Sequence, residues 1–213
     1  MDVGRLARAR GPALRRLPPR VALFQVRAHA LALRLGDVFA LAAAARPDQL
    51  AALLALARGR RTIVELGTAT GWTAASLALA EPGARVISVD PVEQPHRARY
   101  LALAGGAARA RVEVLRATGV EAAHSGPAAG GERGSHTAGG SQAAGGVDLL
   151  FIDSSHERQA TVDEFRAWEP RLARGAVVVF HDHGNPQFPG VEEAVHELGV
   201  AGEAAHGMFV TRR

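Results

Sequence analysis

The 213-residue sequence contains no cysteine and no lysine, and both absences restrict its chemistry. Without cysteine the chain cannot form a disulfide, a zinc–thiolate site or an iron–sulfur site, so any metal must bind through Asp, Glu, His or carbonyl oxygen. The same absence fits a reducing compartment, and we expect a cytoplasmic protein. The absence of lysine removes one common general base, and it means that arginine supplies all of the basic charge behind the net +4.

Long apolar runs are also missing. The most hydrophobic window, residues 21–45, is interrupted by Arg27, Arg34 and Asp37, so the sequence predicts no membrane-spanning helix. Residues 1–20 are rich in arginine but lack the pattern of a signal peptide, and we interpret them as a basic, flexible arm. Arginine without lysine, beside abundant alanine and glycine, indicates a coding bias rather than a nucleic-acid footprint.

Short β-type runs alternate with longer helical ones over most of the chain. The predicted strands are residues 62–67, 85–90, 111–116, 147–153 and 176–180, and the predicted helices between and after them are 72–80, 94–109, a short turn from 119, 157–172 and 190–198. This alternation predicts an α/β fold with a doubly wound, mostly parallel, Rossmann-like sheet that is covered by helices on both faces.

We expect one domain from residue 21 to residue 213. Its N-terminal part, residues 21–58, predicts two extra helices (21–44 and 48–58), and residues 203–211 predict a closing pair of strands. Residues 122–146 contain almost only Gly, Ala, Ser and polar residues, which predicts a flexible surface insertion. His124 and His136 lie within it, and we assign them no role.

The first predicted strand ends in a glycine-containing stretch, ELGTATG, which includes Glu65, Gly67 and Gly71 at the turn from strand to helix. Residues without a Cβ let a ligand approach the backbone, and the helix that follows offers free N–H groups to an anion. Asp90 ends the next strand, where a carboxylate can accept both hydroxyls of a ribose. The spacing differs from the GxGxxG pattern of dinucleotide-binding proteins, so that class is disfavoured.

From about Asp48 to the C-terminus, these features resemble the class I S-adenosylmethionine-dependent methyltransferases. The resemblance implies S-adenosylmethionine as cofactor, with its methionine part over the turn at Glu65, Gly67, Thr68 and Gly71 and its ribose on Asp90. Members of that family often carry a Gly-Asp pair near the adenine after the third strand. Here Ala117-Thr118 takes this place, which makes Thr118 the expected neighbour of the adenine.

Two carboxylates follow the fourth and fifth predicted strands, Asp153 in FIDSSH and Asp182 in FHDH. The carboxyl ends of parallel strands face one crevice, so we expect the two groups to meet. Converging carboxylates repel each other unless a cation or a shared proton lies between them, and a divalent cation is the simpler answer. The alternative is that each carboxylate only caps the segment after its strand. In an extended chain His181 and His183 would share one face and Asp182 the other.

The run FIDSSHERQATVDEFRAWEPRLARGAVVVFHDH resembles the metal-assisted O-methyltransferases, both the catechol type and the cephalosporin-tailoring group. This resemblance implies methyl transfer to a hydroxyl of a small molecule, with Asp153, His181 and Asp182 as ligands of magnesium or manganese. His181 takes the place of the first member of the Asp-Asn pair of the catechol type.

The catechol type also carries a lysine base three residues after its first acid, and here His156 has that spacing from Asp153. Ser154 and Glu157 predict a capping box, which would place His156 in the first helical turn. There the helix dipole disfavours imidazolium, so the ring would stay neutral and could accept a proton from a hydroxyl. The alternative is that His156 only begins the helix.

Two other functions compete with this interpretation. One is a nucleic-acid or protein N-methyltransferase, although base-methylating members of the superfamily carry an Asn/Asp-Pro-Pro-aromatic motif after strand four, which FIDSSH does not match. The other is a non-catalytic module that binds a cofactor or a partner on the same fold. The sequence leaves open both the identity of the acceptor and the formation of a homo-oligomer.

Overall fold

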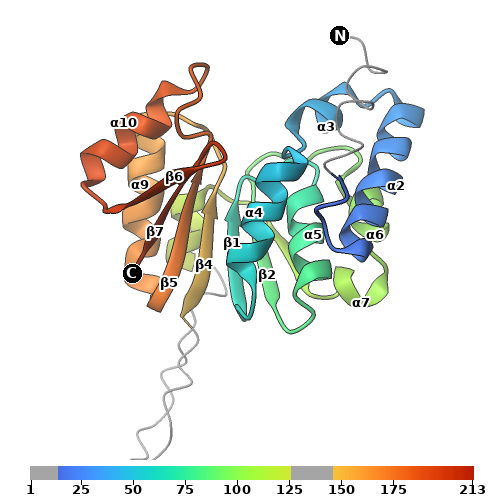
Figure 1. Cartoon of the computed structure of the whole chain (residues 1–213), viewed down its shortest axis with the longest axis horizontal. Helices are drawn as coiled ribbons and strands as arrows, with labels where there is room; N and C mark the ends of the chain where they lie inside the picture. The colour runs from blue at the N-terminus through green and yellow to red at the C-terminus, as the bar shows by residue number, and fades with distance from the viewer. Residues whose placement is uncertain (1–13, 126–145) are drawn as a thin grey trace, which may run out of the picture.

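The computed structural model describes residues 14–125 and 146–213, and within them one sheet has the strand order β3-β2-β1-β4-β5-β7-β6 (Figure 1). The strands are β1 (Thr62–Leu66), β2 (Arg85–Val89), β3 (Val112–Leu115), β4 (Val147–Ile152), β5 (Leu172–His181), β6 (Gly202–Ala205) and β7 (Met208–Arg212). Strands β1 to β5 are parallel, and β7 lies antiparallel between β5 and β6. The predicted α/β class and mostly parallel sheet are confirmed.

Helices cover both faces of the sheet, as Figure 1 shows for α9 and α10 on one side and α2, α4 and α5 on the other. The first layer consists of α2 (Pro19–Leu35), α3 (Val38–Ala43), α4 (Pro47–Ala57), α5 (Trp72–Ala80), α6 (Arg97–Ala102) and α7 (Gly106–Arg109). The second layer consists of α8 (Gly119–Ser125), α9 (Arg158–Trp168) and α10 (Pro189–Leu198).

Neighbouring residues of each central strand belong to opposite cores. Ile63 and Phe151 pack under the first helical layer, whereas Val64 and Ile152 pack under the second. Successive side chains of a strand point to opposite faces, so a strand that is covered on both faces can be apolar throughout. Burial of each of these side chains stabilises the folded state by about 1.5–3 kcal/mol.

Three predicted helices are shorter than their sequence patterns indicated. Residues 21–44 form two helices, because Gly36 takes a left-handed conformation (φ 65°) and Asp37 then caps α3 through the Ala40 N–H at 2.9 Å. Residues 94–109 are divided at Gly105 (φ 81°) into α6 and α7. The Trp168 end of α9 is followed by Pro170 in a short 3₁₀ turn, and β5 begins at residue 172, earlier than predicted.

The two segments that we predicted to be flexible lie mainly outside the described residues. Of the arm, residues 1–13 are not described, whereas Leu17 is buried and α2 begins at Pro19. Residues 126–145 of the insertion, with His136, are also not described. Residues 122–125 do not belong to a loop, because they form the last turn of α8, where Ala122 and Ala123 are buried.

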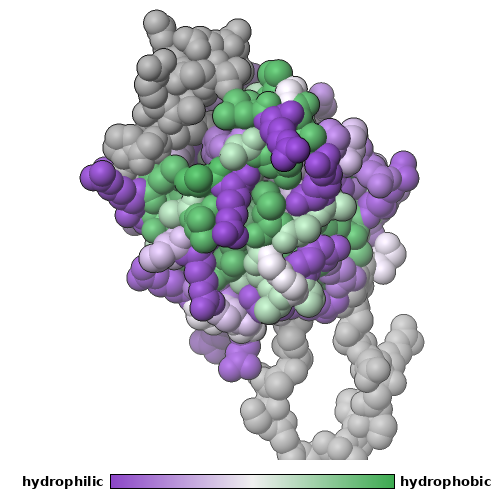
Figure 2. All heavy atoms as spheres, turned by 90° about the vertical axis from the view of Figure 1, so that its right-hand side faces the viewer, coloured by the Kyte–Doolittle hydropathy of each residue, from purple (hydrophilic) through white to green (hydrophobic). Residues whose placement is uncertain are grey.

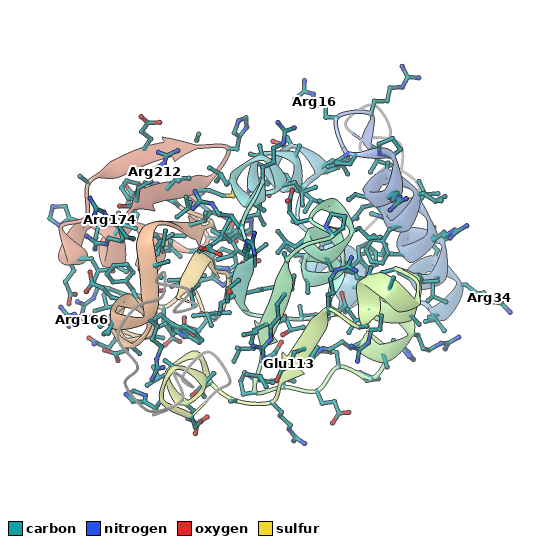
Figure 3. All side chains as sticks on the ribbon, turned by 90° about the horizontal axis from the view of Figure 1, so that it is seen from below. Arg16, Arg34, Glu113, Arg166, Arg174 and Arg212 are labelled. Carbon is teal, nitrogen blue, oxygen red and sulfur yellow. The ribbon has the colours of Figure 1, made fainter. Side chains whose placement is uncertain are left out.

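The surface mixes charged and apolar side chains. On the face that Figure 2 shows, apolar residues lie among hydrophilic ones. The exposed large apolar side chains of the described residues include Leu23, Val26 and Phe39. Arg34 points outward at one end of the molecule, and Arg166 and Arg174 point outward at the other (Figure 3). No helix of the described ranges has the length and hydrophobicity needed to cross a membrane.

Trp168 fastens α9 to α8, because its indole N–H donates a buried hydrogen bond of 2.8 Å to the Gly119 carbonyl. We expect Trp168→Phe to lower the free energy of unfolding by about 1–3 kcal/mol more than Trp72→Phe, because a buried carbonyl loses its partner. Trp72 is the matched control, since its buried indole nitrogen has no hydrogen-bond partner among the described residues. Urea denaturation measures both variants, and equal losses would contradict a role for this hydrogen bond.

Candidate active site

The register of the sheet brings the ends of four strands to one edge. Leu66 of β1 pairs with Val89 of β2 and with Ile152 of β4, which in turn pairs with Phe180 of β5. The residues that follow these four therefore lie side by side: Gly67, Asp90, Asp153 and His181. A cleft of about 1160 Å³ opens at this edge and has residues of all four strand ends in its wall. This volume can hold a cofactor together with a small acceptor.

Gly67 lies in the wall of the cleft, in direct contact with the end of β4. Its φ of 99° disfavours any side chain, and a Cβ at this position would overlap the carbonyl of Asp153. Gly71 is also in a left-handed conformation (φ 82°), but it begins α5 behind the wall, where a Cβ would meet Leu101 at 2.9 Å. Packing within the protein thus requires glycine at both positions, whether or not a ligand binds.

Asp90 holds the glycine turn in place. Its Oδ2 accepts hydrogen bonds from the Ala69 N–H (2.7 Å) and from Arg97 (3.2 Å), and its Oδ1 accepts one from the Val92 N–H (2.7 Å). Arg97 also donates from Nε to the Ala69 carbonyl at 2.7 Å. Asp90 lies in the cleft wall, and its Oδ1 has one acceptor site left. We did not predict the buried Arg97 from the sequence, because it lies seven positions after Asp90, in a helix of its own.

Glu65 and Thr68 lie behind the cleft wall. The Ser88 hydroxyl is hydrogen-bonded to Glu65 and lies 2.7 Å from the Thr68 hydroxyl. Burial raises the pKa of Glu65 to about 8, and the negative charges of Asp153 and Asp90 add to this, although the Ser88 hydrogen bond opposes it. A protonated Glu65 can donate to Ser88, and the single Ser88 proton is then free for Thr68.

Thr118 lies in the wall of the cleft, beside Gly119. Its backbone N–H and its hydroxyl both donate to Glu121, each at 2.9 Å. Glu164 of α9 fills the space next to Gly119 so closely that a Cβ there would lie 2.5 Å from its carboxylate. Burial raises the pKa of Glu164. We did not predict a role for Glu164 from the sequence, because its position within the predicted helix 157–172 does not indicate that it faces the cleft.

Four side chains meet deeper in the cleft: Asp153, His156, His181 and Asp182. Within the described residues they form a group in which one atom from each lies within 4.8 Å of all the others. His181 Nδ1 is 2.9 Å from Asp153 Oδ1 and 3.3 Å from Asp182 Oδ2. His156 Nε2 is 3.2 Å from Asp153 Oδ1 and 3.3 Å from Asp182 Oδ2. The structure thus joins Asp153, His181 and Asp182, which we predicted as metal ligands, with the predicted base His156.

Two of these positions depend on unusual backbone conformations. Asp182 has φ 59°, so the chain does not stay extended after β5, and Asp182 and His181 reach the same group instead of opposite faces. His183 instead packs beside Phe209, with 5.2 Å between the ring centroids. A hydrogen bond from Asn185 to Asp182 Oδ1 (3.0 Å) holds the turn and leaves Oδ2 for the group.

The predicted capping box is wrong. Helix α9 begins at Arg158 after Glu157, without a side-chain cap, and the Ser154 hydroxyl donates to Glu164 at 2.5 Å instead. His156 therefore precedes the helix, with φ 61°.

The charges of the group also differ from the prediction. Burial by itself would lower the pKa of His156, but its contacts with Asp153 and Asp182 outweigh burial and raise that pKa to about 9. The same balance raises the pKa of His181 to about 10. Burial disfavours charge on Asp153 and Asp182 as well, yet the two imidazoles hold both carboxyl pKa values below their usual range. Without a metal ion, the imidazole of His156 is thus more basic than the predicted helix position would make it.

Comparison with known families identifies the class of protein. A family model described as a methyltransferase domain matches residues 64–183, which is more than half of the chain. The chain therefore belongs to this family of methyltransferase domains. The matched segment runs from β1 through the turn after β5, and so includes most of the cleft wall and the whole group of four. A search of curated proteins finds no significant match.

Solved structures share the fold at low sequence identity. The O-methyltransferase TomG from Streptomyces achromogenes, in complex with SAM, is 20% identical, with a TM-score of 0.55 over 79% of this chain and 81% of that one. The O-methyltransferase from Bacillus cereus, in complex with SAH, is 18% identical, with a TM-score of 0.57 over 81% and 84%. The calicheamicin methyltransferase CalS11 is 15% identical, with a TM-score of 0.59 over 78% and 79%.

The buried Glu65 predicts a measurable pH dependence of stability. Its pKa is about 8 in the folded protein against 4.5 for a free glutamate, so only the unfolded chain loses this proton between these values. The free energy of unfolding should then fall as the pH rises from about 4.5 to about 8, on the order of 1.4 kcal/mol per pH unit at most. We expect Glu65→Gln to remove this loss. Denaturation with a chelator present, at pH 5 and pH 8.5, tests it: a difference from wild type that is the same at both pH values would contradict the raised pKa.

Proposed function

We propose that this methyltransferase transfers a methyl group from S-adenosylmethionine to a hydroxyl of a small molecule with the help of a divalent cation. The observation that supports it is the arrangement of the cleft. The glycine turn and Asp90 form one part of its wall, and Asp153, His181 and Asp182 meet beside them. The O-methyltransferases TomG and that from Bacillus cereus, whose structures hold SAM and SAH, share this fold and support the proposal.

The cofactor side of the cleft fits S-adenosylmethionine. Gly67 leaves its backbone open to a ligand, and the remaining acceptor site of Asp90 Oδ1 can take a ribose hydroxyl. Thr118 would lie near the adenine. When bound, S-adenosylmethionine supplies a methyl group on a positively charged sulfur, which is transferred in line to a nucleophile.

The metal side fits a divalent cation held by Asp153, His181 and Asp182. Their converging atoms come from two carboxylates and one buried imidazole, a donor set that binds divalent ions. Such an ion lowers the pKa of a hydroxyl that binds it. The protein would orient the acceptor oxygen toward the cofactor methyl. The base role predicted for His156 stays a prediction.

The acceptor side of the cleft is mostly apolar. Phe39 and residues 42–45 contribute from α3 and the segment after it, and Phe188 contributes from the segment before α10. Arg46 and Gln187 add polar groups to the wall. This composition favours a small molecule with an apolar body and at least one hydroxyl. We place the enzyme in the cytoplasm because it lacks cysteine.

The proposal is tested by titrating the full-length protein with S-adenosylmethionine in a calorimeter and by assaying turnover on a panel of phenols, catechols and other hydroxylated metabolites. We expect cofactor binding, and turnover that chelation abolishes. No binding at high micromolar cofactor would refute the proposal. Turnover that chelation does not affect would support the methyltransferase activity but refute the role of a metal in it.

Asp182→Asn separates catalysis from cofactor binding, since Asp182 lies in the group of four and follows β5, which is two strands away from β1 and its glycine turn. We expect kcat to fall by at least about 100-fold, because an amide cannot replace the carboxylate charge, while Kd for S-adenosylmethionine changes less than about threefold. His183→Asn is the matched control, because its ring packs on Phe209 outside the group. Equal losses of turnover and cofactor affinity in Asp182→Asn would indicate a structural role.

A further inference from the structure

The group of four contains more than the three predicted ligands. The same four atoms recur in every contact: Asp153 Oδ1, Asp182 Oδ2, His181 Nδ1 and His156 Nε2. Each imidazole nitrogen lies between the two carboxylate oxygens, at 2.9 and 3.3 Å for His181 and at 3.2 and 3.3 Å for His156. Nitrogen and oxygen therefore alternate around one point, and His156 contributes to this arrangement as fully as His181 does.

These separations match the edges of a coordination shell. Ligand atoms at about 2.0–2.2 Å from one ion are roughly 2.9–3.6 Å apart when they subtend right or tetrahedral angles. The four nitrogen–oxygen separations, 2.9 to 3.3 Å, fall within this range. The nitrogen–oxygen edges of the group are therefore those expected around a single ion, and the two remaining pairs of atoms lie within 4.8 Å of each other.

A buried nitrogen without a hydrogen bond provides a second, independent observation. His181 is 8% exposed, and neither its Nδ1 nor its Nε2 has a hydrogen-bond partner of good geometry among the described residues, although Asp153 Oδ1 is only 2.9 Å from Nδ1. The two atoms are close, but the angle at the ring nitrogen is not that of a hydrogen bond to this oxygen. Buried polar atoms normally have a partner. If His181 Nδ1 and Asp153 Oδ1 both pointed at one metal ion, they would lie close together without forming a hydrogen bond to each other.

His156 is held in its position by Phe188 and by the first turn of α10. Its ring stacks on Phe188, with 4.3 Å between the centroids and 23° between the planes. Gly190 packs so tightly on the His156 carbonyl that a Cβ would lie 2.7 Å from it. A left-handed backbone at a histidine (φ 61°) persists only where the surroundings enforce it, and such conformations cluster at functional sites.

We propose that His156 is the fourth metal ligand, so that two imidazoles and two carboxylates bind a first-row transition-metal ion in preference to magnesium. The inference refines the metal site of the proposed function. Magnesium prefers oxygen ligands, whereas imidazole suits zinc, iron, copper and nickel, and manganese accepts carboxylates readily. The position that carries a lysine base in the catechol type would here carry a ligand.

Metal titrations of the unmodified, full-length protein test the proposal after treatment with a chelator. We expect zinc and cobalt to bind at least about 1000-fold more tightly than magnesium, with manganese between them. X-ray absorption of the zinc-loaded protein counts the imidazoles, and we expect two. Magnesium binding as tight as zinc binding, or a single imidazole on zinc, would overturn the proposal. Because these measurements use the wild-type chain, they do not depend on how a variant folds.

Substitution of His156 tests its part in the selectivity. We expect His156→Asp to lower zinc affinity by about 10- to 100-fold and to raise the affinity for magnesium, because oxygen replaces nitrogen in the ligand set. His183→Asp is the matched control, and both affinities should stay within about threefold of wild type. Unchanged zinc affinity in a folded His156→Asp protein, judged by circular dichroism, would overturn the role of His156.

Titration with S-adenosylmethionine keeps the two proposals separate. Cofactor binding together with a magnesium-selective site would refute this inference and leave the methyltransferase function standing. A two-imidazole zinc site in a protein that does not bind the cofactor would refute the function and support the inference.

Discussion

The backbone of Gly67 lies directly against the carbonyl of Asp153, and this contact joins the two parts of the cleft. On one side of it the turn after β1 offers open backbone, and on the other side the end of β4 begins the group of four. The parallel pairing of β1 with β4 sets the contact, since it aligns Leu66 with Ile152. If a side chain separated the two turns, the cofactor wall and the metal side would move apart. The transfer of a methyl group needs them within reach of each other.

Carboxylates are the most numerous ionisable groups in the cleft wall. Asp90, Asp153, Asp182 and Glu164 all lie in its wall, and Glu65 lies just behind. Arg97 balances Asp90, and the two imidazoles balance the carboxylates of the group, but the charges of Asp90 and Asp153 still raise the pKa of Glu65. A divalent cation can replace the two imidazole protons of the group without a change of net charge, so these carboxylates suit a positively charged ligand. Both the sulfonium of S-adenosylmethionine and a divalent cation meet that requirement, which makes the two halves of the proposal mutually consistent.

Much of this arrangement was predictable, because it depends on local patterns. Apolar runs separated by amphipathic ones predicted the parallel sheet, and the polar residues that end β4 and β5 predicted that Asp153 and Asp182 meet, since parallel strands end at one edge. The predictions were less accurate where a single residue redirects the chain. Gly36 and Gly105 each divide a predicted helix, and both have positive φ, which a periodic pattern of apolar residues does not reveal.

The sequence by itself determined the class of fold, the glycine turn and the presence of acids and histidines at the strand ends, because strand alternation and residue chemistry are local properties. Only the tertiary structure decided which atoms converge. His156 reaches the group because Phe188 and Gly190, more than thirty residues later in the chain, fix its backbone and ring. Asp182 reaches it because its left-handed backbone turns it toward His181. These conformations are unfavourable in isolation and are stabilised by contacts between distant segments, so no local pattern could reveal them.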